Sequence, residues 1–119
     1  MKKEDVRSST IDVPTKCTLS QTLDIIGGKW RLPIIWELSA RESMRYNELK
    51  RHMNGITNIM LTRALRGLEE NGLVTRKEHS QIPPCVEYSL TESSKRLLPA
   101  LKYINEWGIN SLLNSDSEN

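Results

Sequence analysis

The chain has 119 residues, 37% of them hydrophobic, and a formal net charge of +2. This length fits one small domain with a modest core, so burial against a second chain would add stability. The sequence has no apolar run long enough to span a membrane and no apolar secretory signal at its start, so we expect a cytoplasmic protein.

The first two helices are predicted after a polar start. Residues 1–16 are charged and polar, and we expect a mobile arm. Thr18 is a suitable N-cap for a helix in which Leu19, Leu23 and Ile26 recur at helical spacing, ending at Gly27-Gly28. Residues 29–38, KWRLPIIWEL, predict a buried central helix because they leave almost no polar side.

Two further helices follow at close spacing. Residues 44–55, MRYNELKRHMNG, predict a short extended piece and then a helix with Tyr46, Leu49 and Met53 facing inward. A helix from about residue 58 to 71 is then bounded by the N-cap Thr57 and by Gly72. Two helices joined by a short turn that contains glycine form a helix-turn-helix motif.

The helix at 58–71 has two unlike faces. Leu61, Leu65 and Leu68 form an apolar stripe that faces a core. The opposite face carries amide, hydroxyl and guanidinium groups and one isoleucine, from Asn58, Ile59, Thr62, Arg63 and Arg66. Its N-terminal half has no carboxylates, which suits the approach of phosphate. We interpret it as a recognition helix, the alternative being an ordinary amphipathic surface helix.

The C-terminal part predicts a hairpin and a long helix. Residues 73–78 and 85–90 are two short strands, and the hairpin between them, with His79, Ser80 and Gln81 at its tip and Lys77 nearby, is a candidate wing. Thr91 then caps a helix that continues to Leu112, with a bend expected near Leu98 because of Pro99. Its apolar stripe predicts a twofold dimer together with the first helix, the alternative being that it folds back on its own domain.

Several motifs occur together and in order: LDIIGGKWRLPIIWEL, RYNELKRHMNGIT, MLTRALRGLEENGLVTR and PPCVEYSLTESSKRLLPALKYINEWG. On these the chain resembles the HxlR-type winged helix-turn-helix regulators, a branch close to the MarR regulators. The resemblance implies a mainly α member of the α+β class, a winged helix-turn-helix with a two-stranded wing and N- and C-terminal dimerisation helices. We assign this domain to residues 17–114 and a polar tail to 115–119.

The resemblance also implies a homodimeric bacterial transcription regulator. Each subunit is expected to place its recognition helix in a major groove and its wing beside the adjacent minor groove. Cys17 matches a cysteine that senses quinones, electrophiles or oxidants in some members. The sequence departs from the family pattern at four positions, namely Thr18, Ile59, Gly67 and Cys85.

The two cysteines allow different interpretations. Lys16 and the start of the first helix would favour the thiolate of Cys17, so a sensor thiol is one hypothesis and a small buried cysteine the other. Cys85 is interpreted as inert rather than as a resolving partner. With His52 and His79 as the only histidines, the cysteines give no metal-ligand spacing, and we predict neither a metal site nor a cofactor.

Charge and side-chain chemistry point to double-stranded DNA as the partner. From Arg41 to Arg66 there are six basic residues and two acidic ones. We expect Asn58, Thr62, Arg63 and Arg66 in the major groove, with Ile59 against a thymine methyl or a sugar. The predicted phosphate contacts come from Arg45, Lys50 and Arg51 and from the wing residues Lys77, His79, Ser80 and Gln81.

Other functions fit less well. The sequence has no glycine-rich phosphate loop, no paired carboxylates in an apolar setting and no Ser/His/Asp spacing, so we do not expect an enzyme. A winged helix used as a protein-interaction module is the remaining alternative. That function favours an apolar or mixed-charge recognition face, and only Ile59 supports it.

Overall fold

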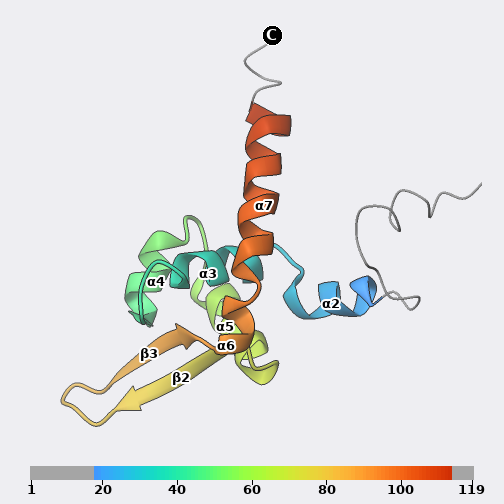
Figure 1. Ribbon diagram of the computed structural model, residues 1–119. Helices are drawn as coiled ribbons and strands as arrows, with labels where there is room; N and C mark the ends of the chain where they lie inside the picture. Colours follow the sequence, from blue (N-terminus) through green and yellow to red (C-terminus); the bar gives the residue numbers. More distant parts are fainter. Residues whose placement is uncertain (1–17, 114–119) are drawn as a thin grey trace, which may run out of the picture.

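The computed structural model describes residues 18–113, which form a helical body from which a β-hairpin and a C-terminal helix project (Figure 1). The predicted arm 1–16, Cys17 and the tail 115–119 lie outside the described residues. The elements in chain order are α2 (Leu19–Ile26), α3 (Arg31–Leu38), β1 (Met44–Arg45), α4 (Tyr46–His52), α5 (Asn58–Glu70), β2 (Val74–His79), β3 (Cys85–Leu90), α6 (Glu92–Lys95), α7 (Leu98–Gly108) and a π-helical turn η1 (Ile109–Leu113).

The helix-turn-helix consists of α4 and α5, as predicted. Thr57 has extended backbone and its hydroxyl accepts a hydrogen bond from the Met60 amide, so it caps α5 as expected. Gly55 in the turn and Gly72 after the helix have φ of 86° and 74°, the left-handed region that favours glycine. The turn is longer than predicted, because α4 ends at His52 and Met53 to Thr57 connect the helices.

The core lies where α3, α4 and α5 meet the sheet. Ile34, Ile35 and Leu38 of α3 pack with Leu49 of α4, and all four side chains are buried. The α5 stripe completes this core from its apolar face, as predicted, through Leu61, Ala64, Leu65 and Leu68. Burial of each large aliphatic side chain contributes about 1.5–3 kcal/mol, so the inner face of α5 is fixed by packing.

The prediction that α3 is buried on all sides was wrong. Trp36 is 41% exposed, and Trp30 and Leu32 are only half-buried. The helix has eight residues and contacts α4, α5, β3 and α7, which leaves one side of it uncovered. A domain of this size does not have enough chain to surround a central helix.

The sheet has three antiparallel strands in the order β1-β3-β2. The predicted hairpin is confirmed as β2 and β3, in register from Val74 opposite Leu90 to His79 opposite Cys85. The short extended piece, β1, adds a third strand by pairing Met44 with Tyr88. Tyr88 is buried and Val86 and Leu90 pack against the core, so the predicted inward face of β3 is confirmed.

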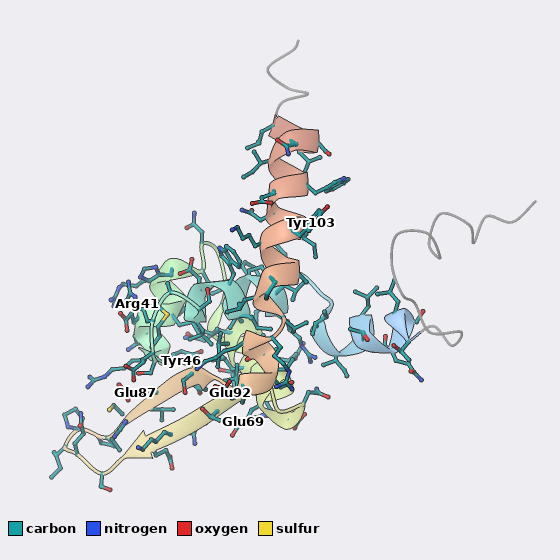
Figure 2. The ribbon with its side chains drawn as sticks, in the orientation of Figure 1. Arg41, Tyr46, Glu69, Glu87, Glu92 and Tyr103 are labelled. Atoms are coloured by element: carbon teal, nitrogen blue, oxygen red, sulfur yellow. The ribbon has the colours of Figure 1, made fainter. Side chains whose placement is uncertain are left out.

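The C-terminal segment is two helices rather than one bent helix. Thr91 caps α6 by accepting from the Ser94 amide, but the helix ends at Lys95 and α7 begins at Leu98. Pro99 explains the break, because it has no amide hydrogen to donate to the carbonyl one turn earlier. Beyond Leu101, α7 leaves the body, and Tyr103 stands out from it into solvent (Figure 2), so folding back on the domain is excluded for this helix.

Candidate nucleic-acid interface

The outward face of α5 carries the five residues that the sequence predicted. Asn58, Ile59, Thr62, Arg63 and Arg66 are all exposed and together line a shallow surface depression of about 340 Å³. The first turn of α5 has no acidic residue, and Glu69 lies at the opposite end of the helix (Figure 2). Within residues 18–113, Arg63 and Arg66 take part in no ion pair, so their charges are uncompensated.

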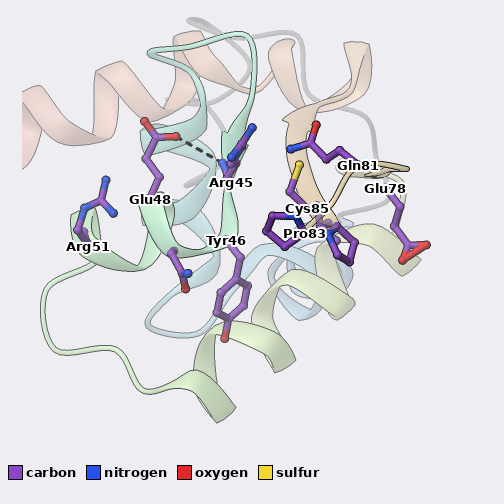
Figure 3. A pocket seen from close by; sticks show the side chains of 11 residues that line it. Arg45, Tyr46, Glu48, Arg51, Glu78, Gln81, Pro83 and Cys85 are labelled. Carbon is purple, nitrogen blue, oxygen red and sulfur yellow. Dashed lines mark hydrogen bonds between the residues drawn. The ribbon is translucent and has the colours of Figure 1, made fainter.

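Tyr46 is a site residue that the sequence analysis missed. It was predicted to face the core, but it is half-buried and its ring points from α4 toward α5 (Figure 3). Its ring does pack against the core, as predicted, but its hydroxyl oxygen lies 3.0 Å from the Thr62 hydroxyl, 3.1 Å from the Asn58 carbonyl oxygen and 3.3 Å from Asn58 Oδ1. The sequence could not predict these contacts, because an aromatic residue at an inward helical position is ordinarily a core residue.

A groove separates α4 from the wing, and its charged lining residues are two arginines and the carboxylates Glu48 and Glu78. Arg45 and Arg51 line this groove of about 810 Å³ together with Gln81 at the hairpin tip (Figure 3). Both arginines are exposed and Lys50 is half-buried, and the three predicted phosphate-contacting cations lie on α4 or directly before it. Glu48, which also lines the groove, is already engaged by Arg41.

The wing differs from the prediction at one residue. His79 is not at the tip but is the last residue of β2, and its Nε2 lies 2.7 Å from Glu87 Oε1 on β3. Ser80 and Gln81 are at the tip and, like Lys77, are exposed. A short strand pair thus holds the imidazole against a carboxylate and leaves Lys77, Ser80 and Gln81 to face solvent.

Arg76 adds a further fixed positive charge to the wing. It is exposed on β2 opposite Tyr88 on β3 and lies 3.4 Å from Glu78 Oε2. A hydrogen bond with Tyr88, helped by the nearby Glu78 carboxylate, raises the pKa of Arg76 above its ordinary value. The guanidinium is therefore charged at any pH at which DNA binding is of interest.

Arg31 connects the first helix to the recognition helix. Its Nη1 donates to the Ile25 carbonyl at the end of α2, at 2.5 Å. The guanidinium lies over Gly67 of α5, where an added Cβ would stand 2.0 Å from Arg31 Nη2. Gly67 is buried, which explains why a polar side chain is absent there.

The cysteines and candidate metal ligands give little additional chemistry. Cys85 is a free, half-buried thiol on β3 at the edge of the groove between α4 and the wing. Cys17 lies outside the described residues. In the part of the chain that the structure describes, no three His, Cys, Asp or Glu side chains gather as metal ligands, and no helix is long and apolar enough to cross a membrane.

The fold and this interface define the class of winged helix-turn-helix proteins, with a polar and basic recognition helix beside a β-hairpin wing. More particularly, the chain belongs to the HxlR-like helix-turn-helix family, which its sequence matches over residues 25–116. It is a DNA-binding transcriptional regulator.

Known relatives agree in sequence and in fold. The uncharacterized HTH-type transcriptional regulator BH0655 of Halalkalibacterium halodurans is 49% identical over 88 residues, 74% of this chain and 78% of that protein. The uncharacterized HTH-type transcriptional regulator YdzF of Bacillus subtilis is 44% identical over 88 residues, 74% of this chain and 81% of that protein. The structure of the redox regulator HypR in its oxidized form superposes with a TM-score of 0.74 at 42% identity, covering 80% of this chain and 97% of that one.

Proposed function

We propose that this chain acts as a homodimer that places α5 of each subunit in the major groove of a twofold-symmetric DNA site. The observation that carries the proposal is the outward face of α5, where two guanidinium groups that form no ion pair within residues 18–113 stand beside an amide and a hydroxyl. Arginine pairs bidentately with guanine, and amide and hydroxyl groups read other base edges. The proposed partner of this protein is chromosomal DNA. We therefore place the protein in the cytoplasm and assign it a binding rather than a catalytic role.

The residues around α5 would set its position on the duplex. Arg45, Lys50 and Arg51 lie on or directly before α4, and Lys77, Ser80 and Gln81 lie on the wing, with Arg45, Arg51 and Gln81 lining the groove between the two. Contacts from such groups go to phosphates and fix register without reading sequence. His79 is the weakest of the predicted contacts, because Glu87 already holds its imidazole.

Uncovered apolar side chains support the homodimer. Leu19 and Leu23 on α2 and Ile104, Trp107 and Leu112 at the C-terminal end are each at least half exposed. Such a large apolar surface on two projecting helices is unfavourable in water and favours association. A second copy would cover it symmetrically and hold two recognition helices apart.

Site selection from a pool of randomised duplexes tests this function. We expect two half-sites related by a dyad, with centres separated by about 10 bp or a multiple of that spacing. Arg45→Ala should weaken binding to all sequences alike and lower the salt slope by about 1, since it removes one phosphate contact. If no sequence is enriched, the result would favour the protein-interaction alternative. The exposed Ile59 is the one residue on the outward face of α5 that suits that function.

We further propose that Cys17 switches DNA binding when an oxidant or electrophile modifies it. The support comes from Lys16 next to the thiol, from its position directly before α2, and from the likeness to a protein named a redox regulator. Modification there would displace α2, which Arg31 links to α5. Treatment with a quinone or hypochlorite should change the affinity of the wild type and of Cys85→Ser, but not of Cys17→Ser. A response that survives in Cys17→Ser would rule out this switch.

A further inference from the structure

The contacts of the Tyr46 hydroxyl fix the direction of its hydrogen bonds. The Asn58 carbonyl oxygen and Asn58 Oδ1 can only accept, and they lie 3.1 Å and 3.3 Å from the phenol oxygen. The single phenol proton must therefore point to Asn58, because otherwise these oxygens would face the lone pairs of the phenol. The Thr62 hydroxyl, 3.0 Å away, then has to donate to Tyr46.

This arrangement determines what Thr62 can present to DNA. A hydroxyl has one proton, and because the phenol proton goes to Asn58, the proton of Thr62 is directed to Tyr46. Only its oxygen lone pairs are left for the major groove. An acceptor pairs with the amino groups of adenine N6 or cytosine N4, and it repels the keto oxygens of guanine and thymine.

We infer that Tyr46 is a specificity-determining residue that acts through Thr62, making this threonine an acceptor that selects a major-groove amino group. This inference rests on the proposed function, because it needs α5 to lie in the groove. Tyr46 is a positioning residue and touches no base itself. Its two contacts with Asn58 also hold that residue at the first position of α5.

The first part of the experiment locates the base that Thr62 reads. Thr62→Val keeps the shape of the side chain and removes the hydroxyl, so the half-site position whose preference disappears in this variant is the one read. Adenine or cytosine is expected there on the strand that α5 contacts. An analogue duplex then removes the amino group from the major groove. At an A·T pair, 2-aminopurine does this by carrying the amino group at C2, on the minor-groove edge, and it still pairs with thymine.

The wild type should bind the analogue duplex about 2- to 13-fold more weakly, the loss expected for one neutral hydrogen bond. Tyr46→Phe keeps the ring but frees the Thr62 hydroxyl to donate, so its discrimination at this position should fall to less than about twofold. Preferences at positions that neither Thr62 nor Asn58 reads, affinity for unrelated DNA and the salt slope should not change. If Tyr46 only supported the fold, Tyr46→Phe would instead lower the affinity for every DNA sequence to the same extent.

Tyr88→Phe is the matched control, because it deletes the same atom from a tyrosine that faces Arg76 in the sheet. It should discriminate the analogue as the wild type does. The inference is overturned if Tyr46→Phe discriminates as strongly as the wild type, or if the wild type binds the analogue with unchanged affinity. The second measurement needs no variant and so does not depend on the folding of Tyr46→Phe. Absence of any specific site for the wild type would contradict the proposed function itself, and this inference with it.

Discussion

Arg63 and Arg66 are the two charged residues on the outward face of α5. Both are exposed on α5, and among residues 18–113 neither takes part in an ion pair. A guanidinium that forms no ion pair within the protein can bind DNA without the energetic cost of breaking such a pair. The energetic effect of removing one should therefore appear in binding and not in folding.

Arg63→Ala should weaken binding to the specific site by about 1–3 kcal/mol, roughly 5- to 150-fold, and relax selection at one base pair. Its thermal unfolding should match that of the wild type, because the side chain is exposed. Lys95→Ala, which removes a cation paired with Glu92 on α6, is the charge-matched control and should bind as the wild type does. Equal losses in the two variants would show that net charge alone attracts DNA.

At the residue scale, the sequence predicted which α5 side chains face outward but not what holds them. Helical periodicity separates Leu61 and Leu65 from Thr62 and Arg63 without any tertiary information. The contact of Tyr46 with Thr62 joins residues 16 positions apart on two helices. Periodicity within one helix carries no information on such a pair, so Tyr46 was assigned to the core.

At the scale of elements, α5 is defined by its two ends. The Thr57 hydroxyl accepts from the Met60 amide at 3.1 Å, which satisfies one of the free amides of the first turn. Replacing such a cap by alanine costs about 0.5–2 kcal/mol, whereas serine keeps the hydroxyl. Thr57→Ala should lower the free energy of unfolding by about 1 kcal/mol in urea titrations at fixed protein concentration, and Thr57→Ser by much less. A loss in Thr57→Ser as large as that in Thr57→Ala would exclude the hydroxyl as the cause.

The Arg31 contact makes a second prediction about α5. Alanine is more stable than glycine in a helix by about 1 kcal/mol, but at Gly67 its Cβ would displace the Arg31 guanidinium. Gly67→Ala should therefore gain stability only when Arg31 is also truncated to alanine. Chemical denaturation of the wild type, both single variants and the double variant should give a coupling free energy of about 1 kcal/mol. If the stability changes of the two single variants simply added up in the double variant, the alanine methyl group at position 67 and the Arg31 guanidinium would not compete for this space.

Elements were predicted well where their signals are local. The cap Thr57, the glycines at 55 and 72 and the alternation of β3 all lie within a few residues of what they specify. The pairing of β1 with β3 is not local, since Met44 meets Tyr88 across 44 positions of sequence. The split at Pro99 was expected as a bend, and the sequence did not show that the lost hydrogen bond would end α6 completely.

At the scale of the whole molecule, the projecting helices need a partner surface. Trp107 is 62% exposed on α7 and is a suitable anchor for a second copy. Trp107→Glu should weaken the dimer by about 2 kcal/mol or more, roughly 30-fold, and release monomers in sedimentation equilibrium. Ile82→Glu, at a side chain that is fully exposed on the wing, is the matched control and should keep the mass of the wild type. Dimers of Trp107→Glu as tight as those of the wild type would place the interface elsewhere.

The central claim is specific DNA binding by the outward face of α5. The most direct test is a titration of the reduced protein against the DNA upstream of its own coding sequence and against an unrelated duplex of equal length, each at two salt concentrations. We expect the upstream DNA to bind about 10³-fold or more tightly than the unrelated duplex, with affinity for both falling steeply as salt rises. Equal affinity for the two duplexes, at both salt concentrations and in the oxidised protein as well, would contradict the account.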